Sequence, residues 1–258
     1  MAEIVGIVPA AGQATRISPL PCSKELYPIA LRRCELGTRP KVVSHYLFER
    51  MRQAGIRKAY VILREGKWDI PAYFNDGTAL LDMHLAYLMM REPFGPPFTL
   101  DQAHPFVREA IVALGFPDMV FWPDDIFIHM VARHAQSDAD VVLGLVPCDR
   151  PHTADMIEIE RTGRVRRFVI KQRETSLRYA WVAAVWRPTF TQFMHDYLDE
   201  AIHSGEVNRR ELIVGDVMQA AFDCGMHVNS VTFSEGGYVD IGSPEMLEKI
   251  HRGELALP

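Results

Sequence analysis

The sequence is poor in cysteine and has no long apolar run. Only four of its 258 residues are cysteines, namely Cys22, Cys34, Cys148 and Cys224. No pair of them has the spacing of a metal site, and a disulfide framework in a chain of this length would normally use more. No apolar run approaches the roughly 18 residues that span a bilayer, and the N-terminus lacks the basic and apolar regions of a signal peptide. These absences favour reduced thiols, a cytoplasmic location and no membrane partner.

A basic excess is also missing. The formal net charge is -5, whereas domains that bind nucleic acid usually carry a basic face. We therefore expect no nucleic-acid partner, and any polyanion that the protein binds should be small and bound locally. The ten histidines form no cluster, so the sequence predicts no histidine metal centre.

Apolar patterning predicts a parallel β-sheet in the first part of the chain. Residues 4–8 and 58–63 have the composition of buried strands, and residues 41–54 have helical periodicity that ends at Gly55. This order predicts a right-handed parallel crossover. The same sheet is expected to continue through strands at 85–90, 119–122 and 141–146, with helices at 102–114 and 127–136.

After about residue 150 the pattern changes to one that favours antiparallel pairs. The predicted elements are a hairpin (156–160 with 165–170), strands at 179–186 and 226–233, and helices at 188–204, 214–224 and 244–252. No repeat, low-complexity segment or flexible linker interrupts the chain, and its length suits one large α/β domain. We therefore predict a single domain over residues 1–258.

The stretch P-A-A-G-Q-A-T-R, from Pro9 to Arg16, directly follows the first predicted strand. Open α/β sheets bind ligands at the carboxyl ends of their strands. Small residues there let backbone N–H groups approach an anion, and Arg16 and the later Lys24 could pair with phosphate oxygens. Composition alone fits a tight turn equally well, because the chain has neither a G-x-x-x-x-G-K-S/T loop nor a G-x-G-x-x-G fingerprint.

A series of segments in order resembles the sugar nucleotidyltransferases. A-G-Q-A-T-R-I-S-P and S-K-E-L-Y-P-I are similar to that family's G-G-x-G-T-R-L-x-P and K-x-L-x-P-I. The later matches are R-P-K-V-V, A-G-I-R-K-A-Y-V-I-L, W-P-D-D-I-F, E-L-I-V-G-D-V and G-Y-V-D-I-G-S. They extend from about residue 4 to 248 in family order, and they are most similar to the glucose-1-phosphate thymidylyltransferase branch.

The resemblance implies an α/β fold, a single-domain, Rossmann-like nucleotide-diphospho-sugar transferase fold (GT-A-like) whose central sheet is mixed, mainly parallel and flanked by helices. It implies a nucleotide-binding half to about residue 150 and a sugar-phosphate-binding half over residues 151–258. The implied reaction joins a nucleoside triphosphate to a sugar 1-phosphate and releases pyrophosphate, as in thymidylyl- or uridylyltransferases. Family members often form dimers or tetramers, so a homo-oligomer is compatible with the resemblance, although the sequence shows no interface.

The resemblance also implies site residues. Arg16 and Lys24 would be catalytic, holding the triphosphate and stabilising the leaving pyrophosphate. Asp124 and Asp240 would bind Mg²⁺, a hard ion that prefers carboxylate oxygen. Lys171 would contact the sugar phosphate, with Trp181 on the same side. The expected nucleotide contacts are Ala11, Gly12, Gln13, Ala14, Thr15, Met90, Thr99 and Asp124.

Several positions depart from the family pattern. Ala14 replaces a glycine, so a left-handed backbone there would be strained. Met90 stands near the place of a glutamine and cannot pair with a base edge as an amide does, so the base specificity does not transfer. In the family's E-K-P motif Ile170 replaces the acidic residue beside Lys171, which leaves the sugar open.

Two other functions stay open at this point. A glycosyltransferase of related fold is suggested by D-A-D at residues 138–140, although this segment directly precedes an apolar strand. A nucleotide-binding homologue without turnover is suggested by the changes at Ala14, Met90 and Gln172. Taken singly, Asp124 could also cap a helix, and Lys24 and Lys171 could be surface charges.

Overall fold

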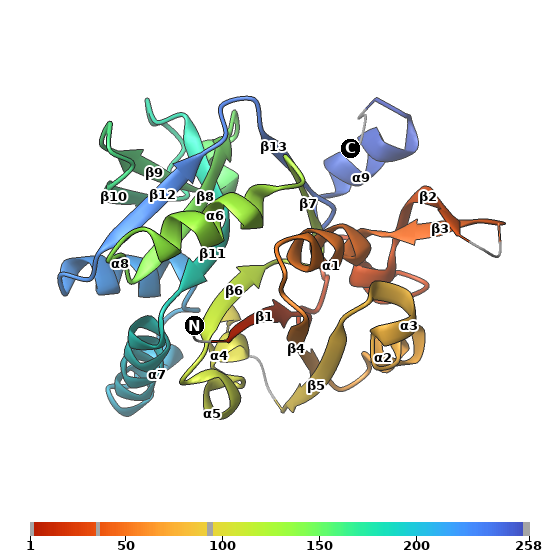
Figure 1. Cartoon of the computed structure of the whole chain (residues 1–258), viewed down its shortest axis with the longest axis horizontal. Coiled ribbons are helices and arrows are strands. Elements are labelled where there is room, and N and C mark those ends of the chain that lie inside the picture. Colours follow the sequence, from red (N-terminus) through yellow and green to blue (C-terminus); the bar gives the residue numbers. More distant parts are fainter. Residues whose placement is uncertain (1–2, 35–36, 92–94, 255–258) are drawn as a thin grey trace.

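A mixed nine-stranded sheet forms the centre of the part of the chain that the computed structural model describes, residues 3–34, 37–91 and 95–254. Its main strand order is β10-β9-β11-β6-β1-β4-β5, and β8 and β12 continue from β11. The parallel strands are β1 (Ile4–Pro9), β4 (Lys58–Arg64), β5 (His84–Met90) and β6 (Ile111–Gly115). Figure 1 shows the chain with its α-helices and β-strands labelled.

The second half of the sheet joins the first through strand β11 (Tyr179–Trp186). This strand runs antiparallel to β6 and also to the two strands β8 and β9, whose bounds are given below. It is buried along nearly its whole length. The remaining strands of this half are β8 (Val141–Pro147), β9 (Asp155–Ile159), β10 (Val165–Ile170) and β12 (Val228–Thr232), of which β12 is parallel to β8. The sheet therefore combines a parallel and a mainly antiparallel half.

Helices cover both faces of the sheet, which is why its central strands are almost continuously apolar. The helices whose side chains pack into one core are α1 (Val43–Gln53), α2 (Asp69–Phe74), α3 (Thr78–Leu81) and α6 (Ile126–Ala135). The opposite core contains α4 (Pro96–Asp101), α5 (His104–Val107), α7 (Pro188–His203) and α8 (Val214–Asp223). Within the described residues, no helix is both long and apolar enough to cross a lipid bilayer.

Two small sheets complete the fold. Strands β7 (Met119–Trp122) and β13 (Gly237–Asp240) pair antiparallel and pack with α9 (Pro244–His251) in a third apolar cluster. Strands β2 (Pro28–Cys34) and β3 (Gly37–Val42) form a hairpin that extends from the body of the molecule (Figure 1). The short 3-10 helices are η1 (Lys24–Leu26), η2 (Pro151–Thr153) and η3 (Glu206–Asn208).

The expected fold class, a mainly parallel sheet flanked by helices, is confirmed, but two expected elements are wrong. The predicted helix at 102–114 ends at Val107, and residues 111–115 form β6, the strand between β1 and β11. Its I-V-A-L-G sequence is buried on both faces, and periodicity cannot distinguish such a strand from a buried helix. Residues 119–122 pair with β13 instead of extending the main sheet, and the β2–β3 hairpin was not predicted.

Gly115 gives a test of how tightly α1 packs on the sheet. A Cβ atom at this position would lie 2.2 Å from Cδ1 of Leu47, which is fully buried. Gly115→Ala should therefore lower the free energy of unfolding by about 1–3 kcal/mol through overpacking. Chemical denaturation of both single variants and of the double variant Gly115→Ala/Leu47→Ala measures this effect. The double variant should lose less stability than the sum of the single changes; strict additivity would contradict the proposed contact.

Candidate active site

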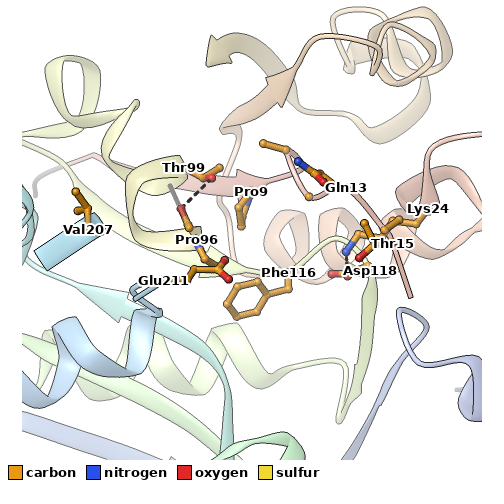
Figure 2. Close-up of a pocket in the computed structure, with 14 residues that line it drawn as sticks. Pro9, Gln13, Thr15, Lys24, Pro96, Thr99, Phe116, Asp118, Val207 and Glu211 are labelled. Carbon is orange, nitrogen blue, oxygen red and sulfur yellow. Dashed lines mark hydrogen bonds and ion pairs between the residues drawn. The ribbon is translucent and has the colours of Figure 1, made fainter. Parts of the chain in front are cut away.

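Two adjoining cavities open at the carboxyl ends of β1 and β6. Their volumes are about 620 and 450 Å³, and both are lined by Pro96, Phe116 and Asp118. Figure 2 shows Gln13, Thr15, Lys24 and Asp118 on one side of the larger cavity and Pro96, Val207 and Glu211 on the other. The smaller cavity is bounded mainly by residues of the second half of the chain. The site is therefore one cleft with two compartments that meet at Asp118.

The loop after β1 forms a wall of the larger cavity. Ala11 to Thr15 all line it. A Cβ atom at Gly12 would lie 3.4 Å from Nζ of Lys24, so the glycine leaves room for the ammonium group. Ala14 adopts a left-handed backbone (φ 56°), the conformation that the sequence identified as costly for a residue with a side chain. Its carbonyl accepts hydrogen bonds from Ile17 and Ser18, which hold the turn.

Four charged side chains meet where the compartments join. Lys24 Nζ lies 2.5 Å from Asp118 Oδ2, and both side chains are largely buried. Arg16 Nη2 lies 3.5 Å from Asp240 Oδ2. The two pairs are neighbours, because a Cβ atom at Gly242 would lie 3.0 Å from Arg16 and Asp240 and 3.7 Å from Asp118. Asp118 and Asp240 come from segments joined by a backbone hydrogen bond between Ile241 and Asp118.

The pKa values of the two carboxylates are shifted in opposite directions. Burial alone would raise the pKa of Asp118, but the nearby Lys24 ammonium outweighs it and holds this pKa below the ordinary value. Burial alone would lower the pKa of Lys24, but Asp118 and Glu25 outweigh it, so this pKa is raised. The pKa of Asp240 is raised by burial and then by repulsion from Asp118. Two carboxylates are thus held close together, with Lys24 paired to one and the mostly exposed Arg16 to the other.

The smaller cavity contains the side chains predicted to contact the sugar phosphate. Lys171 and Trp181 both line it, and so does Arg16, which does not line the larger cavity. Lys171 follows β10 with a left-handed backbone (φ 44°). Trp181 lies on β11 and packs beside Phe116, whose ring centroid is 5.7 Å away. Strand ends of the second half of the sheet therefore place both residues next to the Asp118 junction.

Asp124 does not join this cluster. Its Oδ1 lies 2.5 Å from Nη2 of Arg50, whose side chain is 2% exposed, while the Asp124 side chain is 58% exposed. It lines neither of the two cavities. The structure places Asp118 beside Asp240 instead. Asp118 could have been found as the first acidic residue after the run I-V-A-L-G, had this run been interpreted as a strand that ends at the site.

Met90 is likewise not exposed in the larger cavity. It is buried, and its sulfur accepts a hydrogen bond from the Thr99 hydroxyl at 3.3 Å, whereas Thr99 itself lines the cavity. A buried sulfur beneath a cavity wall supports the wall but presents no hydrogen-bonding edge to a base. Of these two expected nucleotide contacts, only Thr99 is at the cavity surface.

The nucleotidyl transferase family model matches residues 5–256 of the chain. The fold is similar to that of a candidate glucose-1-phosphate thymidylyltransferase from Bacillus anthracis in complex with a sucrose, with a TM-score of 0.80 and 17% identity over 99% of this chain and 97% of that one. It is also similar to a UTP-bound UGPase from Acinetobacter baumannii (TM-score 0.75, 17% identity, 98% and 93% of the chains). A UDP-glucose pyrophosphorylase complexed with UDP-glucose gives a TM-score of 0.77 at 15% identity over 98% of both chains. A comparison with curated proteins gave no match.

The repulsion between Asp118 and Asp240 can be tested through stability. Asp240→Asn removes the repulsion from Asp118, and an asparagine Oδ1 can still accept the hydrogen bond from the Gly242 N–H. In buffer with a chelator, the free energy of unfolding of this variant should exceed that of the wild type by a few tenths to about 1 kcal/mol. The variant should therefore unfold at a higher temperature. Thermal unfolding measures the change, with Asp149→Asn on an exposed loop as a matched control. A lower midpoint would mean that the Arg16–Asp240 pair outweighs the repulsion.

Proposed function

The chain belongs to the nucleotidyl transferase family, and we propose that it transfers a nucleotidyl group from a nucleoside triphosphate to a sugar 1-phosphate, giving a nucleoside diphosphate sugar and pyrophosphate. The observation that carries this proposal is the divided cleft. One compartment has a backbone-lined loop and Lys24, the other has Lys171, and both open onto Asp118. Such a cleft suits two phosphorylated substrates that must react with each other at the junction.

In this proposal the larger cavity binds the triphosphate. The loop from Ala11 to Thr15 would surround the phosphates, and Lys24 would supply a positive charge next to them. Arg16 is two-thirds exposed, and its ion pair within the described residues is with Asp240, so its guanidinium can move to a phosphate at the junction. The base would lie toward Thr99 and Glu211, at the opposite side of this cavity.

The smaller cavity would bind the sugar 1-phosphate, with Lys171 on its phosphate. An oxygen of this phosphate attacks the α-phosphorus of the triphosphate, and pyrophosphate leaves on the opposite side. The protein aligns the two anions and stabilises the charge that develops on the pyrophosphate through Lys24 and Arg16. Proximity matters here because both substrates are anionic and repel each other in free solution.

Asp118 and Asp240 are the residues that would hold Mg²⁺. The donor set fits this ion, because it consists of two carboxylates on neighbouring segments, and Mg²⁺ commonly binds one or two carboxylates together with substrate phosphates. The raised pKa of Asp240 agrees with a position that a cation would stabilise. When bound, the ion would neutralise phosphate charge and help to orient the reacting groups. Asp124 is not part of this set.

The D-A-D segment gives no support to a glycosyltransferase. Asp138 pairs with His227, and Asp140 accepts a hydrogen bond from Thr189, just before β8 and outside both cavities.

We further propose a cytoplasmic location, because Cys22, Cys148 and Cys224 are free. The association of several copies stays a prediction.

The proposed reaction is tested by crossing several nucleoside triphosphates with several sugar 1-phosphates in the presence of Mg²⁺. Release of pyrophosphate should require both substrates, and mass spectrometry should find the matching nucleoside diphosphate sugar. Binding of nucleotide without turnover across the whole panel would indicate a homologue that has lost catalysis. Consumption of a nucleotide sugar without pyrophosphate chemistry would indicate a glycosyltransferase.

The metal assignment is tested by comparing two aspartates. Asp118→Asn should lower kcat by at least about 100-fold and abolish the Mg²⁺-dependent rise in the unfolding temperature. Asp124→Asn should keep kcat within a few-fold and keep the response to Mg²⁺, because its carboxylate contacts Arg50 outside the cleft. Near-native turnover in Asp118→Asn, or loss of the metal response only in Asp124→Asn, would overturn the assignment.

A further inference from the structure

Asp155 is an acidic side chain in the smaller cavity that the proposed chemistry does not use. It begins strand β9 and lines the cavity together with Lys171 and Trp181. Its Oδ1 is buried and has no hydrogen-bond partner among the described residues. Buried carboxylate oxygens almost always accept a hydrogen bond, since leaving one unsatisfied costs free energy. The orphaned oxygen in a substrate-sized cavity indicates that a ligand supplies the missing donor.

The protein's own cations do not satisfy this carboxylate. Within the described part of the chain, no ion pair to Asp155 is formed, although Lys171 is close enough to lower its pKa. Burial, the largest effect, and the charge of Asp216 raise the pKa of Asp155, whereas Lys171 and a side-chain hydrogen bond with Trp181 lower it, and the net shift is upward. The oxygen without a partner is Oδ1. Asp216 itself is occupied by Arg210, at 2.8 Å, and by the N–H of Ile213.

The strand register places Asp155 beside the position of the acidic residue in the E-K-P motif. Asp155 on β9 is directly opposite Ile170 on β10. Directly opposed residues of an antiparallel pair point to the same face of the sheet. Ile170 stands where the E-K-P motif has its acidic residue, immediately before Lys171. The chain thus has a carboxylate at the same level of the sheet and on the same face, contributed by the neighbouring strand.

Gly215 leaves space for this carboxylate. It is the second residue of α8, and a Cβ atom there would lie 2.4 Å from Asp155 Oδ2. Any larger residue would have to displace the carboxylate, which a backbone fixed in the sheet cannot easily accommodate. The position of Asp155 therefore depends on a glycine from a distant part of the chain.

We infer that Asp155 is a specificity-determining residue that accepts a hydrogen bond from a ring hydroxyl of the sugar 1-phosphate. The inference rests on the proposed function, because Lys171 must hold the phosphate for the ring to reach this wall. The hydroxyls that meet Asp155 are then those on the carbons nearest the phosphate, C2 or C3. A carboxylate favours a hydroxyl donor there and repels a second acidic group on the sugar.

The test compares the sugar 1-phosphate that is turned over best with its 2-deoxy and 3-deoxy analogues. In the wild type, one analogue should have kcat/KM lower by about 10- to 100-fold, because its missing hydroxyl leaves Oδ1 of Asp155 unpaired. Asp155→Asn and Asp155→Ala should raise the KM for the full sugar phosphate by a similar factor while the KM for the triphosphate stays unchanged. Asp155→Ala should also no longer distinguish the deoxy analogue from the full sugar.

A second variant changes the position of the carboxylate without removing it. Gly215→Ala should raise the KM for the sugar phosphate in the same way. The matched control for the Asp155 variants is Glu158→Gln, because Glu158 is on the same strand as Asp155 but pairs with Arg167 outside the cavity. Circular dichroism and thermal unfolding confirm that each variant is folded. Unchanged discrimination between sugar and deoxy analogues in folded Asp155→Ala would overturn the inference while the transferase activity stands. Absence of pyrophosphate release by the wild type would instead overturn the proposed function.

Discussion

The ion pair between Lys24 and Asp118 is the contact around which the cleft is organised. Lys24 belongs to the loop and short helix that follow β1, and Asp118 follows β6, so the pair joins the ends of two neighbouring parallel strands. Both side chains are largely buried, and a buried charge without its partner is costly. At the junction of the two cavities Lys24 therefore keeps the pKa of Asp118 below its ordinary value, while burial and then the charge of Asp118 raise the pKa of the neighbouring Asp240.

The two neighbouring carboxylates leave the junction of the cavities suited to a bound cation. A protein that buries two carboxylates together loses stability unless a cation or a positively charged side chain balances them. Arg16 balances them only in part, because it is mostly exposed. The same compromise recurs in the smaller cavity, where Asp155 has an oxygen without a partner. Such features are typical of sites where stability is sacrificed for binding.

The two halves of the sheet contribute different parts of the cleft. The parallel half supplies the loop after β1 and the junction residues, since the carboxyl ends of parallel strands lie at one edge of the sheet. The antiparallel half supplies Lys171 and Trp181 from strands that return toward that edge. Strand β11 connects the halves by pairing with β6 on one side and β8 on the other. The relative position of the two cavities therefore depends on a single buried strand.

The sequence alone determined the fold class, and it predicted the loop from Pro9 to Arg16 with Lys24 and Asp240 as site residues, because these depend on local patterns and on motifs in order. It did not identify β6 or Asp118. A strand buried on both faces has the same apolar composition as a buried helix, and the match of W-P-D-D-I-F to the family motif placed the expected aspartate at position 124. Only the tertiary structure decided that Asp124 contacts Arg50. It also decided that Asp155 lies opposite Ile170, since strand register depends on contacts between residues distant in sequence.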